Sequence, residues 1–373
     1  MNRLVLIGNG FDLAHGLRTS YSDFILWYGH EWGERLLHGH DKSESDELFT
    51  FELNDKIDIS RWCHVWGYYY QRSNPLEPWN PTEVFLKAVE DRQLCDFKIE
   101  SQLLKRIWAQ LSLGWVDIEN VYYSLLTEEK MEYNKGFIKP DYKTLNHHLD
   151  IIKDRLIEYL KLESEKGKNA IDDIASKIHR PIREREMSVT YKGSFYENQC
   201  FDTDPSAIML LNFNYTSTPE LYMSDSSKLS INYIHGKLED PQSVIFGYGD
   251  ELDSRYKVLQ KLNNNEPLRH IKSIRYLESD NYRKMLEFIE SGPFQICIMG
   301  HSCGRSDRTL LNTLFEHRNC VSIKPYYYIK DGKDNYLDLA MNISRNFTDM
   351  KLMRDRVVNK EYCEPLTGES SNV

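Results

Sequence analysis

A glycine-rich segment near the start of the chain has the composition of a nucleotide-binding turn. Gly8-Asn9-Gly10-Phe11-Asp12, followed by Gly16, comes directly after an aliphatic run, where a strand would give way to a helix. Glycines permit positive φ angles and close backbone approach, so that amide N–H groups can hold a phosphate at a helix N-terminus. Because position 13 is Leu, the ordinary GxGxxG pattern is not met. We therefore predict nucleotide-binding residues, with an ordinary strand-to-helix turn as the alternative, at Gly8, Asn9, Gly10, Phe11, Asp12 and Gly16.

Two polar residues follow aliphatic runs that have the character of strands. Asn214 follows the run at 207–213, and His235 follows INYI and precedes Gly236. Open α/β sheets bind ligands outside the carboxyl ends of their strands, so the Asn214 amide could hold a ribose hydroxyl or a water. A neutral imidazole at the same edge could accept a proton at physiological pH. We predict Asn214 and His235 as catalytic residues; the alternatives are an Asx turn or helix cap for Asn214 and a structural role for His235.

The segment that begins at Gly300 repeats the pattern of strand, small-residue turn and helix start. Gly300 and Ser302 would allow a ribose or adenine to approach closely, and Asp307 could bond ribose hydroxyls or cap its helix. We predict all three as nucleotide-binding residues. His301 and Cys303 have no neighbouring Cys/His pair that would complete a zinc site, so we expect no metal.

Asp117 and Glu119 form a further pair of carboxylates, in the segment Trp115-Val116-Asp117-Ile118-Glu119. A spacing of two puts them on nearly opposite sides of a helix or on one face of a strand. They could take part in catalysis or contact a cofactor. The alternative is a buried Trp115 with solvated or capping acids, and the sequence leaves their role open.

Strand patterns alternate with helical patterns at the two ends of the chain, whereas helical patterns dominate its middle. Short aliphatic runs predict strands, of which the first and those at 207–213, 229–234, 294–299 and 321–329 should share one largely parallel sheet; another run lies at 244–249. Apolar residues recurring every three or four positions predict helices at 83–93, 100–111, 145–166, 281–291, 306–317 and 334–347. The acidic stretch 41–56 is predicted to be a solvated loop.

These patterns predict an α/β protein with a Rossmann-like, mostly parallel sheet and a large helical insertion. The nucleotide-binding core would comprise 1–29 and 202–350, the mainly helical insertion 30–201, and a tail 351–373 whose end is disordered. Since the carboxyl ends of the strands meet at one edge, Gly8, Gly10, Asn214, His235, Gly300 and Ser302 should line one pocket.

Composition and charge describe an acidic globular protein. Of 373 residues 40% are hydrophobic, and the net charge of −10 gives no global attraction to nucleic-acid phosphates. The seven cysteines form no CxxC pair, which favours a reducing compartment. No run approaches the ~20 apolar residues of a membrane span, and the apolar start is too short for a signal peptide. We therefore expect a cytoplasmic protein that does not enter a membrane.

Taken together, the motifs of the chain resemble the AbiH family of bacterial abortive-infection proteins. The motifs, in order over nearly the whole chain, are GNGFDLAHGLRTSYSDF at the start, WVDIE at 115, NFNYTST at 212, IHG at 234, FGYGDE at 246 and GHSCGRSD at 300. The same blocks are more distantly similar to the sirtuin-like NAD hydrolases of bacterial defence systems and to sirtuins.

The distant similarity implies a sirtuin-like NAD-binding core. Asn214 matches an Asn in a TNYD-like block, His235 the histidine of an HG block, and Gly300-x-Ser302 with Asp307 a terminal GxS…D block. Asp12 stands where sirtuins usually have Ser, and Arg18 replaces a proline of the sirtuin loop. A four-cysteine zinc module is missing.

The resemblance implies an anti-phage protein that binds NAD and hydrolyses its nicotinamide–ribose bond, with Asn214 positioning the ribose or water and His235 acting as base or ribose contact. The alternative is a non-catalytic sensor module that binds a nucleotide or a phage protein. A homo-oligomer and a phage-protein trigger are compatible with both. The missing zinc cysteines disfavour a protein deacylase, and the acidic residues lack the spacing of a nuclease metal site.

Overall fold

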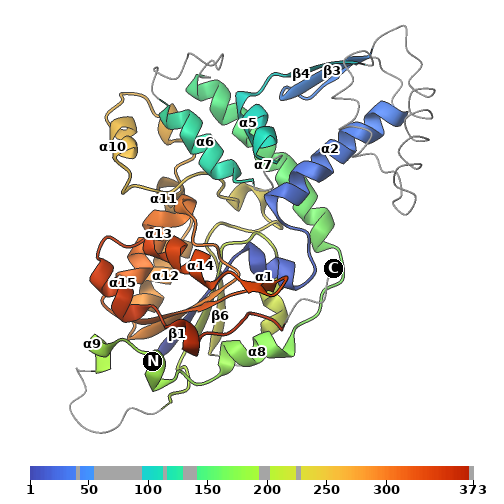
Figure 1. Cartoon of the computed structure of the whole chain (residues 1–373). Coiled ribbons are helices and arrows are strands. Elements are labelled where there is room, and N and C mark those ends of the chain that lie inside the picture. The colour runs from blue at the N-terminus through green and yellow to red at the C-terminus, as the bar shows by residue number, and fades with distance from the viewer. Residues whose placement is uncertain are drawn as a thin grey trace. The chain divides into compact units, whose positions relative to one another are not determined.

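The computed structural model describes residues 1–38, 43–53, 95–111, 116–128, 141–192, 202–223 and 228–368. The helix predicted at 83–93 and the Trp115 side chain lie outside these residues. The chain divides into two compact units, of which the first comprises Met1–Thr19 with Leu160–Val373 and the second Ser20–Tyr159 (Figure 1). Within the described residues, no helix combines the length and the apolar character needed to cross a bilayer.

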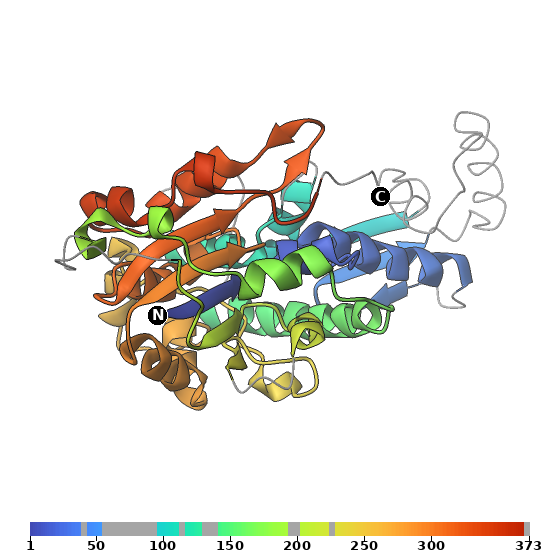
Figure 2. The ribbon, with the colours of Figure 1, turned by 90° about the horizontal axis from the view of Figure 1, so that it is seen from below.

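A five-stranded parallel sheet forms the centre of the first unit. Its strands, in spatial order, are β6 (Leu229–Tyr233), β5 (Ile208–Asn212), β1 (Asn2–Ile7), β7 (Phe294–Met299) and β8 (Cys320–Tyr326). Every neighbouring pair is parallel, so the carboxyl ends of all five strands lie at one edge (Figure 2). The prediction of one parallel sheet, and with it the α/β class, is confirmed.

Apolar side chains of β1 alternate between two faces of the sheet. Leu4 and Leu6 join one core cluster, into which helices α12, α13 and α14 pack, whereas Val5 and Ile7 join another with α1 and α8. Helices on both faces explain why the strand is an almost continuous aliphatic run. The helices are α1 (Asn9–Ala14), α8 (Asp172–His179), α12 (Asn281–Glu290), α13 (Arg308–Phe315), α14 (Tyr336–Ser344) and α15 (Met350–Arg356).

Shorter elements complete the first unit. They are η2 (Glu184–Glu186), α9 (Val189–Lys192), η3 (Thr218–Tyr222), η4 (Pro241–Ser243), α10 (Ser254–Gln260), η5 (Glu266–Leu268), α11 (Lys272–Arg275), η6 (Tyr276–Glu278), η7 (Arg305–Asp307), β9 (Ile329–Lys330), β10 (Lys333–Asp334) and η8 (Lys360–Tyr362). The residues from Leu160 onward belong to this unit, although the sequence analysis placed the insertion at 30–201. Helix α8 belongs to the first unit because its Ile174 and Ile178 pack in the same cluster as Val5 of β1.

A buried polar network crosses β1, β7 and β8. Arg3 donates to two carbonyl groups at the carboxyl end of α8 and, through Nη2, to Oε1 of Gln295 at 2.9 Å. The Nε2 of Gln295 donates to Glu186 at 3.0 Å, and Nζ of Lys324 lies 2.7 Å from the other oxygen of Glu186. The side chains of Lys324 and Glu186 are each 2% exposed. The network fastens the segment between α8 and α9 to the sheet.

The run at 244–249 does not form the predicted strand. Tyr248 instead donates its N–H to the carbonyl of His270 at 3.0 Å and accepts the N–H of Lys272 at 2.9 Å. The segment therefore pairs with a loop rather than with the sheet. Its apolar side chains are buried all the same, which is why the sequence pattern misled.

The second unit combines helices with one small sheet. Its elements are α2 (Tyr21–His38), β2 (Ser43–Ser45), β3 (Phe49–Leu53), β4 (Cys95–Ile99), α5 (Gln102–Leu111), α6 (Ile118–Thr127) and the part of α7 (Tyr142–Ser164) up to Tyr159. Strands β2, β3 and β4 form an antiparallel sheet in that order. For the described residues 43–53 the prediction of a loop is thus wrong; the alternation in Phe49-Thr-Phe-Glu-Leu53 is the period of a strand.

Candidate functional site

The glycine-rich turn after β1 packs directly against the turn after β7. Gly10 donates its N–H to the Gly300 carbonyl at 2.8 Å, and Gly8 donates to the carbonyl of Met299 at 3.3 Å. Gly300 has φ +76°, and a Cβ there would lie 2.0 Å from the backbone nitrogen of Phe11. Only a glycine fits this crossing of two backbones.

This packing also uses the amides that were predicted to hold a phosphate. The N–H groups of Gly8 and Gly10 donate as described, and that of Phe11 donates to the Gly8 carbonyl at 2.8 Å. In this arrangement the three groups are not available to a ligand. Phe11 itself is fully buried and packs against the rings of His15 and Tyr222. Backbone packing accounts for Gly8, Gly10 and Gly300.

Gly300→Ala is expected to lower the free energy of unfolding by about 2–4 kcal/mol, because the added methyl group is both overpacked and in a left-handed conformation. Gly304→Ala is the matched control four residues on. A Cβ there meets only the Ser302 hydroxyl at 3.6 Å, and φ is −65°. The control should change stability by less than about 1 kcal/mol, in the stabilising direction. Equal urea midpoints for the two variants would contradict the packing argument.

The remaining predicted residues of the first turn have protein partners. Asn9 accepts the Thr19 hydroxyl at 2.6 Å, and Gly16, with φ +80°, turns the chain after α1. Asp12 is 1% exposed and its carboxylate accepts the Thr216 hydroxyl at 2.8 Å. Burial raises the pKa of Asp12, although hydrogen bonds from Thr218 and Thr216 oppose the rise. Asp12 thereby ties the first turn to the segment after β5.

Asn214 is half-buried beside the first turn. Its Nδ2 donates to the carbonyl of Gly8 at 3.0 Å. The Asx turn predicted as the alternative exists, but Asn212 makes it: its Oδ1 accepts the N–H of Asn214, and its Nδ2 donates to the Thr216 carbonyl. Asn214 is therefore held at the carboxyl edge of the sheet without being the turn-forming residue.

His235 lies two residues beyond β6 and is buried, with 3% of its surface exposed. Its Nδ1 is 3.2 Å from the Phe213 carbonyl, and its Nε2 is 3.1 Å from the Tyr276 hydroxyl. Because a carbonyl only accepts, Nδ1 carries the proton, and the Tyr276 hydroxyl can donate to Nε2. Burial, and next the charge of Lys272, lower the pKa of His235. A neutral ring with its proton on Nδ1 has its lone pair on Nε2.

Burial gives the His235 ring a role in packing. A residue at a strand tip that faces a cleft would contribute little to packing. Instead the His235 ring stacks on Tyr276 at 6.0 Å and meets Phe213 edge-on at 5.3 Å. Truncation to alanine should therefore destabilise the fold.

Asp307 lies at the centre of a buried charge cluster. Its Oδ1 is 2.8 Å from Nζ of Lys272 and 3.3 Å from Nε2 of His235, and its Oδ2 is 3.6 Å from Nε2 of His301. Burial alone would raise the pKa of Asp307, but the charge of Lys272, followed by the contacts with His235 and His301, holds it well below its ordinary value. Although Asp307 precedes α13, its side chain makes no capping hydrogen bond, so the capping interpretation fails.

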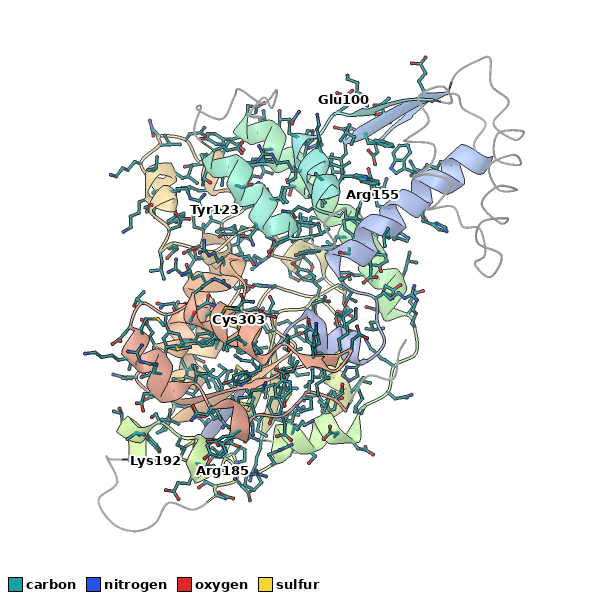
Figure 3. All side chains as sticks on the ribbon, in the orientation of Figure 1. Glu100, Tyr123, Arg155, Arg185, Lys192 and Cys303 are labelled. Atoms are coloured by element: carbon teal, nitrogen blue, oxygen red, sulfur yellow. The ribbon has the colours of Figure 1, made fainter. Side chains whose placement is uncertain are left out.

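The other residues of the last turn take different positions. The Nδ1 of His301 accepts the N–H of Cys303 at 2.9 Å, so in the neutral ring the proton is on Nε2, facing Asp307. Ser302 is exposed and its carbonyl accepts Nδ2 of Asn342. Cys303, labelled in Figure 3, is buried, which raises the pKa of its thiol. Within the described ranges, no group of three or more His, Cys, Asp or Glu residues could hold a metal ion.

Lys272 and Tyr276 are site residues that the sequence analysis missed. They are four positions apart, on the helical turns α11 and η6, so both side chains can reach the same point. That spacing is the signal in the sequence, but neither residue follows a strand. His301 was noticed only as a candidate metal ligand.

Asp117 and Glu119 lie in the second unit. Asp117 caps α6 by accepting the N–H of Asn120 at 2.9 Å, and Glu119 is buried in the first turn of the helix. The capping alternative is therefore correct for Asp117.

Comparison with known proteins gives one match. No curated protein and no solved structure matches the chain. The family model described as bacteriophage abortive infection AbiH matches residues 4–328, which include β1 from Leu4 onward, the four later strands up to Tyr326, and every residue of the cluster around Asp307. The chain therefore belongs to the AbiH family of bacteriophage abortive-infection proteins.

Proposed function

We propose that this protein acts in abortive infection by binding NAD at the carboxyl edge of the parallel sheet and hydrolysing the nicotinamide–ribose bond. The observation that supports the proposal is the convergence of four segments. The segments that follow β6 and β7 contact the buried carboxylate of Asp307 through His235 and His301, and those that follow β1 and β5 are joined by the bond from Asn214 to Gly8. All four segments lie at the carboxyl edge of the sheet, where open α/β sheets bind ligands.

In this proposal His235 is the general base. Water attacks the ribose carbon and loses a proton to Nε2 of His235, while the electrons of the C–N bond pass to the departing nicotinamide. Asn214 orients the water or a ribose hydroxyl. Since His235 is 3% exposed and Tyr276 covers its Nε2, that hydroxyl must move aside before the reaction. The N–H groups of Gly8, Gly10 and Phe11 already donate to backbone carbonyls. They can therefore bind the diphosphate of NAD only if the two turns separate.

The test is to mix purified protein with NAD, alone and with phage lysate, and to measure nicotinamide and ADP-ribose. Stoichiometric appearance of both products is the expected result. NAD that remains intact under both conditions, with a folded protein, would rule out the hydrolase.

The second candidate is a non-catalytic module that binds a nucleotide or a phage protein. The observation that favours it is that His235 and the glycine-turn amides already have protein partners. Calorimetry with NAD separates the two candidates, since saturable binding without product would support the module and exclude the enzyme.

A further inference from the structure

Lys272 and His235 approach the same oxygen of the same carboxylate. The Oδ1 of Asp307 is 2.8 Å from Nζ of Lys272 and 3.3 Å from Nε2 of His235. The shorter contact belongs to Lys272, whose side chain is 2% exposed. A protonated His235 ring at the same oxygen would lie close to the Lys272 ammonium group and be repelled by it. The geometry therefore favours Lys272 as the charged partner of this oxygen.

The FGYGDE motif at 246–251 holds Lys272 in this position. The N–H of Lys272 donates to the Tyr248 carbonyl at 2.9 Å. A Cβ on Gly249 would come within 3.3 Å of the Lys272 Cβ, and one on Gly247 within 1.9 Å of the His270 carbonyl. The two glycines thus allow the motif to lie directly against the segment that bears Lys272.

We propose that Lys272 is a positioning residue that keeps Nε2 of His235 free of a proton, by occupying the carboxylate oxygen that an imidazolium would need. The other groups that face this point agree with a neutral ring. The Tyr276 hydroxyl can donate to Nε2, and in a neutral His301 ring the proton on Nε2 faces the second oxygen of Asp307. Cys303, beside Asp307, is kept a neutral thiol by burial.

The relevance of this assignment to catalysis rests on the proposed function, but its test does not. The protonation of His235 can be followed by nitrogen-detected NMR on protein labelled with ¹⁵N-histidine, with the His235 signals identified by their loss in His235→Asn. In the wild type, His235 should be neutral at pH 6.5, the ordinary pKa of histidine. In Lys272→Met, no ammonium group contacts Asp307, so its carboxylate can stabilise a protonated His235 ring. The pKa of His235 should then rise by about 1–3 pH units.

Three further variants provide an alternative substitution and controls for this test. Lys272→Gln retains a hydrogen-bond donor to Asp307 and serves if the Met variant folds poorly; it should also raise the pKa of His235. The double variant Lys272→Met/Asp307→Asn removes the carboxylate and should return His235 to the neutral form. Lys324→Met removes an equally buried lysine from the pair with Glu186 and should leave His235 unchanged.

The proposal is overturned if His235 titrates alike in the wild type, Lys272→Met and Lys272→Gln, or if Lys324→Met moves its pKa as far as Lys272→Met does. Where NAD turnover is measurable, the acid limb of its pH profile should move to higher pH in Lys272→Gln, since His235 must then lose its proton first. A shifted His235 titration without any NAD turnover would leave the role of Lys272 intact and reject the hydrolase.

Discussion

His235→Asn is expected to lower the rate of NAD hydrolysis by about 10²–10⁴, the usual contribution of a general base. Asparagine is chosen because its Nδ2 can still donate to the Phe213 carbonyl. Alanine would strand that carbonyl and leave a cavity beside Tyr276, which would cost about 1–3 kcal/mol of stability. The readouts are kcat from nicotinamide release and plaque counts on cells that carry the variant.

His15→Asn is the matched control for this substitution. Nδ1 of His15 contacts the Phe11 carbonyl at 2.7 Å and its Nε2 the Tyr222 hydroxyl at 2.6 Å, so the two histidines share their kinds of partner. Of the two, only His235 also contacts an aspartate among the residues that the structure describes. His15→Asn should keep most of the activity. A folded His235→Asn protein that consumes NAD at the parental rate would remove His235 from the mechanism.

Glu186→Ala is expected to lower the free energy of unfolding by about 3–5 kcal/mol, because it leaves a buried ammonium group without its closest counter-charge. The carboxylate of Glu186 accepts hydrogen bonds from Nζ of Lys324 at 2.7 Å and from Nε2 of Gln295 at 3.0 Å. The next carboxylate, Glu364, is 3.5 Å from Lys324, but its side chain is 35% exposed and it also pairs with Arg180. It can replace Glu186 only in part.

Urea denaturation with Glu158→Ala as control would check this prediction. Glu158 pairs with Arg155 on the surface of α7, where its side chain is 52% exposed. Loss of such a pair costs about 0.5 kcal/mol or less. If Glu186→Ala destabilised the protein no more than the control, the buried network would not be a determinant of stability.

The sheet could be predicted because its strands are recognisable as aliphatic runs in the sequence. β1, β5 and β7 are short aliphatic runs followed by Gly or Asn, and burial on both faces requires such runs. The run at 244–249 looks the same, yet it pairs with 270–272. A run of six residues does not show whether the segment will join the sheet or pair with a loop, because tertiary structure determines the segment with which it pairs.

The site was predictable only where residues follow strands. That rule selected Asn214, His235 and Asp307, whose roles stay predictions. It could not find Lys272 or Tyr276, which reach the site from a short helical turn between strands. Nor could it foresee that Tyr276 covers His235, because burial of one side chain depends on a partner 41 positions away.

The position of β1 at the centre of the sheet has a consequence for synthesis on the ribosome. Its two neighbours are β5 and β7, both of which are translated long after it. At 5–20 residues per second, roughly 15–60 s separate the completion of β1 from that of β7. Throughout this interval the apolar strand has at least one edge without its native partner, and all of Ser20–Tyr159 is made while it waits. Nascent chains arrested before Met299 should therefore need chaperones more than the finished protein does.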